Sequence, residues 1–179
     1  MKSLSKWASA AAAVVLLAGT SAAADAIYAG KVKTINADKK EVVLTADDKD
    51  TTFKLADGVV VNRAGKDSQS DLKVGDSINV LYDKGLLSWT ARYILVKEGD
   101  HQYSELERGA FKGYDPDKKV ITFTDQYGHD VSFAAGGVKV RLNKEDSKPE
   151  DLKIGDVTLA IVKKVDDKAT LQVLMVDRK

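Results

Sequence analysis

The chain of 179 residues contains no cysteine, only two prolines, two methionines and two histidines. Without cysteine the protein has no disulfide, no thiol redox chemistry, no cysteine-ligated zinc and no lipid attached through a thiol. The formal net charge is +1, so no basic excess indicates a surface for nucleic acid. Stability must therefore come from burial of apolar side chains, which the hydrophobic content of 44% permits.

The N-terminal segment differs from the rest of the chain. Two lysines precede an apolar run from about residue 8 to residue 19, and small residues follow before Asp25. This order is typical of a secretory signal peptide, and the run is too short to span a bilayer comfortably. We expect cleavage after Ala24, with Ala22 and Ala26 as nearby alternatives. The protein is then predicted to be periplasmic or secreted, with no membrane span after cleavage.

A six-residue phrase occurs twice, as DLKVGD at 71–76 and as DLKIGD at 151–156. Other segments match in the same order, and the clearest pair is Gly30–Thr45 with Gly109–Thr124. Matches that keep their order along the chain indicate an internal duplication. The sequence therefore predicts two homologous units.

Each unit is predicted to be all-β. Short runs rich in β-branched and aromatic residues alternate with turn signals, and no sustained 3.6-residue apolar period follows the N-terminal segment. Five or six strands in about seventy residues indicate a small closed barrel, because closure removes exposed sheet edges. We predict a signal peptide at 1–24, a first β-barrel at 25–97, a linker at 98–108 with a short helical turn, and a second β-barrel at 109–179.

The repeated phrase is predicted to form a corner that starts a strand in each barrel. In the first copy Gly75 permits a tight turn with positive φ, and Asp76 can accept hydrogen bonds from nearby backbone N–H groups. Leu72 is predicted to close the end of the barrel, and Val74 and Ile78 are both predicted to enter the core. The phrase therefore indicates architecture rather than catalysis.

The order of these motifs resembles small exported OB-like or SH3-like barrel domains, here in tandem, many of which belong to bacterial families of unknown function. The resemblance depends on a G-x-V start, a D-K-K turn, and the segments SDLKVGDSINVLY and ARYILV. It covers nearly the whole chain after the N-terminal segment and implies a fold rather than an activity. Periplasmic OB-fold metal-binding and stress proteins are more distantly similar. Their copper-handling members use His, Met and Trp within one barrel, whereas Met175 here lies in the unit without Trp.

No motif indicates a catalytic centre or a cofactor site. The G-x-S-x-G, P-loop and H-E-x-x-H signatures are absent, and no Ser, His and Asp have a plausible triad spacing. His129 with Asp125 and Asp130 could supply only a weak metal site, and His101 has no second histidine nearby. The acidic stretch 46–50 lacks the ligand spacing of an EF-hand. We therefore expect no catalytic activity, no bound metal and no cofactor.

The clearest functional signal is a difference between the two copies. The first unit has aromatic residues where the second has aliphatic ones: Tyr82, Trp89 and Tyr93 align with Val162, Ala169 and Val173. Aromatic rings on a barrel face can stack on sugars, bases or partner side chains, and Arg92 could contact an anion. We predict a ligand-binding site made of Tyr82, Trp89, Arg92 and Tyr93. The alternative is that the tyrosines fill the core, because they alternate with core positions.

The second unit differs in the opposite sense. Its segment VTLAIV at 157–162 is apolar on both alternating faces, whereas SINVLY at 77–82 is polar on one face. A strand that is apolar on both faces is usually buried on both. We therefore predict that Val157, Leu159 and Ile161 form an interface with the first unit or with a second chain.

Together these features predict a non-enzymatic exported binding or interaction module of the cell envelope. Its partner would be an envelope protein or a small ligand rather than nucleic acid. A periplasmic metal- or small-ligand-binding stress protein and a structural envelope spacer are the alternatives.

Overall fold

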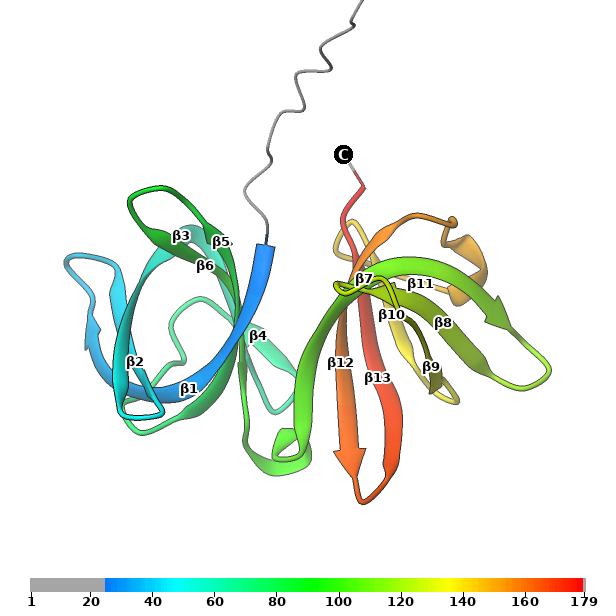
Figure 1. Cartoon of the computed structure of the whole chain (residues 1–179), viewed down its shortest axis with the longest axis horizontal. Helices are drawn as coiled ribbons and strands as arrows, with labels where there is room; N and C mark the ends of the chain where they lie inside the picture. The colour runs from blue at the N-terminus through cyan, green and yellow to red at the C-terminus, as the bar shows by residue number, and fades with distance from the viewer. Residues whose placement is uncertain (1–24, 179) are drawn as a thin grey trace, which may run out of the picture.

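A computed structural model describes residues 25–178 of the chain (Figure 1). The predicted signal peptide lies outside the described residues. Strands account for most of the described chain, together with two short 3-10 helices, η1 (Gly99–His101) and η2 (Pro149–Asp151). No α-helix occurs between residues 25 and 178. The prediction of an all-β fold is confirmed.

The first barrel is made of β1 (Asp25–Asn36), β2 (Glu41–Ala46), β3 (Lys49–Arg63), β4 (Lys66–Ser68), β5 (Ser77–Lys84) and β6 (Trp89–Val96). Five of these strands close into a ring in the order β1-β2-β3-β6-β5, and β5 pairs again with β1. Neighbours in the ring are antiparallel except β3 and β6, which are parallel. This connectivity is that of an OB-like barrel, with β4 as a short hairpin arm on β3.

The second barrel repeats this arrangement with β7 (Ser104–Asp115), β8 (Val120–Asp125), β9 (Asp130–Ala134), β10 (Lys139–Leu142), β11 (Glu145–Ser147), β12 (Val157–Val165) and β13 (Lys168–Val176). Strand β12 lies between β13 and β7, as β5 lies between β6 and β1. Strands β9 and β10 together take the place of the long β3, and both pair in parallel with β13. The prediction of two tandem small β-barrels is confirmed.

The connection between the barrels is shorter than the predicted linker. Only residues 97–103 join β6 to β7, because β7 begins at Ser104. Leu106, which falls inside the predicted linker, is buried. The connection contains η1, and its His101 is also buried, with Nδ1 3.2 Å from Oε1 of Gln172 in β13. His101 of this stretch therefore packs against the second barrel, whereas most of its neighbours in 97–103 are exposed.

Each barrel encloses its own apolar core. Leu44 and Phe53 are fully buried in the first barrel, and the corresponding Phe123 and Phe133 are buried in the second. Alternate residues of each strand face inward, so one face of every strand supplies the core. The two cores are separate clusters, which means that each unit buries apolar surface of its own.

The repeated phrase forms the same corner in both barrels. Gly75 and Gly155 have φ values of 94° and 91°, a left-handed conformation that glycine adopts without strain. The carboxylates of Asp76 and Asp156 each accept a hydrogen bond from the backbone N–H three residues earlier, at 2.7 and 2.8 Å. The phrase is thus a structural turn.

The prediction that Val74 enters the core is wrong. Its side chain is 66% exposed, and the equivalent Ile154 is also exposed, because each precedes the turn glycine at the tip of the corner. Leu72 packs against the first core and Ile78 is buried within it. The alternation of inward and outward side chains holds within a strand but not across a tight turn. Ile78, in the strand after the corner, therefore follows the predicted pattern, and Val74, before the turn glycine, does not.

An arginine anchors each corner, but the two arginines come from different parts of the fold. Arg63 at the end of β3 forms an ion pair with Asp76. Arg178, which follows β13, forms the corresponding pair with Asp156, with Nη2 2.6 Å from Oδ2. A residue that follows the last strand therefore anchors the corner of the second barrel.

The Arg178→Ala variant should lose less stability than wild type when the pH is lowered into the acidic range. Hydrogen bonds from Arg178 hold the pKa of Asp156 below its usual range. A carboxyl whose pKa is lower in the folded state adds stability that is complete above its unfolded pKa of about 3.9 and is lost as the pH falls through the folded value. We expect Arg178→Ala to have a lower Tm than wild type near neutral pH and a smaller further loss on acidification.

Thermal unfolding followed by circular dichroism between about pH 2 and pH 7 measures this difference. Lys168→Ala, an exposed position in the same barrel, is the control and should follow the wild-type curve. Parallel curves for Arg178→Ala and wild type would show that the ion pair does not contribute.

The two barrels pack against each other through one apolar cluster, here called the inter-barrel cluster. Its members are Ile27, Val60, Leu81, Tyr93, Leu95, Leu106, Leu159, Ile161, Val173 and Met175. Eight of the ten form equivalent pairs in the two repeats: 27 with 106, 81 with 161, 93 with 173, and 95 with 175. Both barrels therefore use the same face to contact each other, and Figure 1 shows them side by side.

Polar groups also cross this interface. Asn79 is buried, and its Oδ1 accepts a hydrogen bond from the backbone N–H of Leu106 at 3.0 Å. Arg108 of β7 contacts the Asp25 carboxylate of β1 at 2.7 Å. A buried hydrogen bond is costly to break, so these contacts fix how the barrels sit together.

Candidate binding site

The structure divides the four predicted ligand-binding residues between two faces of the first barrel. Tyr82 and Trp89 stack, with ring centroids 5.0 Å apart, whereas Tyr93 lies in the inter-barrel cluster. A β-bulge causes the separation: the pairing of β6 with β5 shifts at Arg92, and the extra residue turns Tyr93 away from Trp89. The predicted four-residue site is therefore not assembled on one surface.

Tyr93 and Arg92 are both engaged elsewhere. Tyr93 is buried beside the ion pair of Arg141 with Asp67, which joins the barrels at 2.5 Å, and burial raises the pKa of its phenol. Arg92 is half-exposed, and its Nη1 lies 3.2 Å from the carboxylate of Asp83. Neither side chain faces Trp89, so they do not extend a site around it.

The three predicted interface residues have different surroundings along β12. Ile161 is fully buried in the inter-barrel cluster, and Leu159 packs against that cluster from the same face. Val157 lies outside it and is 55% exposed. The contacts of Ile161 and Leu159 are thus made with the first barrel of the same chain.

Trp89 belongs to an aromatic cluster at one end of the first barrel. Phe53 is its centre, with ring centroids 5.3 Å from Tyr28, 5.1 Å from Tyr82 and 5.7 Å from Trp89. Tyr82 and Phe53 are buried, whereas Trp89 keeps part of its surface exposed. Tyr28 is also partly exposed, and Trp89 is the ring of this cluster that lines a pocket.

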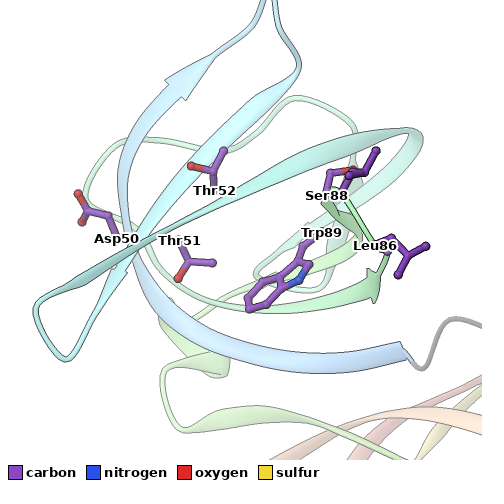
Figure 2. Close-up of a pocket in the computed structure, with 8 residues that line it drawn as sticks. Asp50, Thr51, Thr52, Leu86, Ser88 and Trp89 are labelled. Atoms are coloured by element: carbon purple, nitrogen blue, oxygen red, sulfur yellow. The ribbon is translucent and has the colours of Figure 1, made fainter.

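An open pocket of about 340 Å³ lies beside Trp89. Its walls come from the start of β3 and from the β5–β6 turn: Asp50, Thr51, Thr52, Gly85, Leu86, Leu87, Ser88 and Trp89. Figure 2 shows the indole of Trp89 within the ring of strands, while Leu86 points away from the barrel. The pocket is thus bordered on one side by apolar side chains and on the other by short polar ones.

Two residues that the sequence analysis missed dominate the rim of this pocket. Leu86 and Leu87 are 105% and 101% exposed at the tip of the turn, which a hydrogen bond of 3.1 Å from Gly85 N–H to Ser88 O closes. The signal was available in the sequence, because a turn tip normally carries Gly, Asn or Asp rather than leucine. The equivalent turn of the second barrel has two aspartates, at 166–167.

Asp50 is the only ionisable side chain that lines this pocket. Its carboxylate accepts hydrogen bonds from Lys33 at 2.5 Å and from Thr45 at 2.7 Å, which hold its pKa below the usual range. The second barrel repeats the arrangement with Asp130, Lys112 and Thr124. Because both barrels have this trio, it is part of the fold, and the distinguishing features of the pocket are Trp89 and the two leucines.

The described residues offer little for metal binding. No group of three or more His, Asp or Glu side chains converges anywhere in residues 25–178. His129 lies in an exposed turn with Nδ1 3.5 Å from Asp125. Within the same range, the chain has no helix with the length and apolar content needed to cross a membrane.

Comparisons with known proteins do not indicate a function for this chain. Neither the models of known protein families nor the curated proteins include a match to this chain. The function is therefore inferred from the geometry described above.

Proposed function

We propose that the protein is a non-enzymatic, exported binding module of the cell envelope, and that the end of the first barrel around Trp89 is its binding surface. The observation that supports this most directly is the pair of fully exposed leucines, Leu86 and Leu87, beside a partly exposed tryptophan. Apolar side chains held in water at a turn do not stabilise the fold, and two adjacent leucines beside a tryptophan form a small patch that is suited to an interaction. Export is supported by the sequence pattern of the first 24 residues.

The comparison between the barrels strengthens this proposal. The two repeats share their corner, their ring of strands and their Asp–Lys–Thr trio, so these features belong to the fold. The turn between the last two long strands differs sharply: it is apolar in the first barrel and acidic in the second, at Asp166 and Asp167. Because this turn is exposed and does not contribute to either core, its difference supports a role that only the first barrel performs.

A structural spacer is the second candidate, and the fixed docking of the barrels favours it. The inter-barrel cluster and the buried hydrogen bond of Asn79 give a rigid unit of two domains. Rigidity is also useful to a binding module, because it holds the binding surface in one orientation. The exposed leucines have no function in a spacer, and for this reason we prefer the binding module.

Replacing both leucines by aspartate, the residue found in the second barrel, should abolish association with the native envelope. The experiment uses residues 25–179, which include every described strand, mixed with the envelope fraction of the source organism and sedimented. We expect the wild-type chain to sediment with the envelope and L86D/L87D to be retained at least about tenfold less. The variant should fold normally, because substitutions at fully exposed positions change stability by only about 0.5 kcal/mol.

Val74→Asp is the matched control, since it places an aspartate at another exposed apolar turn of the same barrel. It should sediment like wild type. Equal retention of L86D/L87D and wild type would contradict the proposed binding surface, and failure of the wild-type chain to sediment would favour the spacer.

A further inference from the structure

We infer that the partner of this surface is a lipid bilayer, into which Leu86, Leu87 and the exposed edge of Trp89 insert. This inference rests on the proposed function and names its partner. It depends on the shape of the β5–β6 turn, on the residues that flank it, and on where the chain enters the first barrel.

The shape of the turn suits insertion. Leu86 and Leu87 occupy the tip, and their full exposure means that neither packs against the barrel. Moving a leucine side chain from water to an apolar phase favours binding by roughly tenfold to hundredfold. A protruding turn can enter a lipid surface without any change in the barrel, whereas a protein partner would need to supply a matching groove.

The flanking residues are those expected where a protein meets a bilayer. The ammonium group of Lys84 lies 5.6 Å from the centroid of the Trp89 ring. Tryptophan is enriched at the boundary between lipid and water, and lysine extends its apolar stem while its charge stays with the headgroups. The order Lys84, Leu86, Leu87, Trp89 therefore places a cation and an indole on either side of an apolar tip.

Two carboxylates close to this turn do not oppose a lipid surface strongly, because both have basic partners. Asp83, next to Lys84, pairs with Arg92 at 3.2 Å. Asp50, in the pocket wall, pairs with Lys33 at 2.5 Å. The charges of these two carboxylates are thus compensated within the protein.

The path of the chain brings this end of the barrel close to a membrane during export. Strand β1 begins at Asp25, which pairs with Asp83, so the chain enters the barrel beside the β5–β6 turn. Residues 20–24 separate the apolar run from Asp25. Even fully extended, these residues span only about 20 Å. When the apolar run is in the bilayer, the start of β1 and the β5–β6 turn beside it therefore stay near its surface.

The size of the patch also favours lipid over protein. A stable protein–protein interface buries about 800 Å² on each partner. Two leucines and part of one indole provide much less apolar area than this. Shallow insertion into a bilayer needs no minimum area, and weak, reversible attachment is the expected result.

Tryptophan fluorescence gives a direct test. Residues 25–179 contain a single tryptophan, Trp89, so its emission reports on the proposed site alone. The probes are vesicles of phosphatidylcholine, with and without phosphatidylglycerol, and the same vesicles with brominated acyl chains. We expect wild type to show a blue shift and quenching by the brominated lipid, and L86D/L87D to partition at least about tenfold less. Val74→Asp should behave like wild type.

Three results would overturn the inference. One is no change in Trp89 emission with any vesicle, and another is an equal change for wild type and L86D/L87D. The third is binding that requires phosphatidylglycerol but not the leucines, which would indicate surface charge rather than insertion. If vesicle binding fails while envelope sedimentation still depends on the leucines, the partner is a protein or glycan and the proposed function stands. If both fail, the proposed function fails as well.

Discussion

Replacing Ile161 by aspartate is expected to separate the two barrels without unfolding either of them. The side chain of Ile161 is fully buried in the inter-barrel cluster, between Tyr93 and Leu106. Its burial is worth about 1.5–3 kcal/mol, and an unpaired carboxylate in the same place would cost several kcal/mol more. The protein can avoid that cost by opening the interface, because each barrel keeps its own core.

Small-angle X-ray scattering measures this outcome as an increase in the radius of gyration, while the circular dichroism spectrum stays unchanged. Val157→Asp is the matched control: it lies on the same face of β12 but is largely exposed, so it should leave the scattering curve as it is. Leu159→Asp should give an intermediate result. An unchanged radius of gyration for Ile161→Asp would contradict the role assigned to the cluster.

Replacing Phe53 by alanine should destabilise the first barrel more than any exposed substitution. Phe53 is fully buried and supports three rings, those of Tyr28, Tyr82 and Trp89. Removing a buried phenylalanine ring typically costs about 3–5 kcal/mol, because the lost transfer energy adds to the cost of the cavity. We expect a much lower urea midpoint, and a change in Trp89 emission before unfolding since the indole loses a neighbour.

The matched control is Phe133→Ala, the equivalent position in the second barrel. Phe133 contacts one ring, that of Phe123, at 5.1 Å. Its substitution should lower the midpoint seen by circular dichroism and leave the native emission of Trp89 unchanged. A wild-type midpoint for Phe53→Ala would show that the aromatic cluster is not the centre of the first core.

The all-β fold and the two barrels could be predicted because they depend on local signals. Repeated phrases, turn residues and alternating apolar positions are visible in the sequence, and each corresponds to a strand or a corner in the structure. The faces of individual side chains were harder to predict. Tyr93 and Ala91 lie on opposite faces of β6 because the strand contains a bulge at Arg92. A prediction based on a strict two-residue period places them on the same face, since it does not allow for the extra residue.

The contact between the barrels could be predicted only in part. The apolar character of residues 157–162 indicated a covered strand. The strand that faces it was less clear, because Asn79 is polar and its partner, the N–H of Leu106, lies in a stretch with many charged residues. A buried amide that bonds to a distant backbone group has no local pattern. Leu86 and Leu87 were missed for a different reason: the predicted site was built from aromatic residues, which the structure places in strands, and these two leucines lie in a turn.

The inter-barrel cluster has a consequence for how the protein stays assembled. Because equivalent residues of both repeats meet there, the chain corresponds to a two-fold dimer whose subunits have been joined by seven residues, 97–103. A short tether gives the second barrel an effective concentration in the millimolar range around the first. A single barrel made alone would have to find its twin by collision, and the pair would dissociate on dilution. In the joined chain, pairing of the barrels does not depend on how much protein is present.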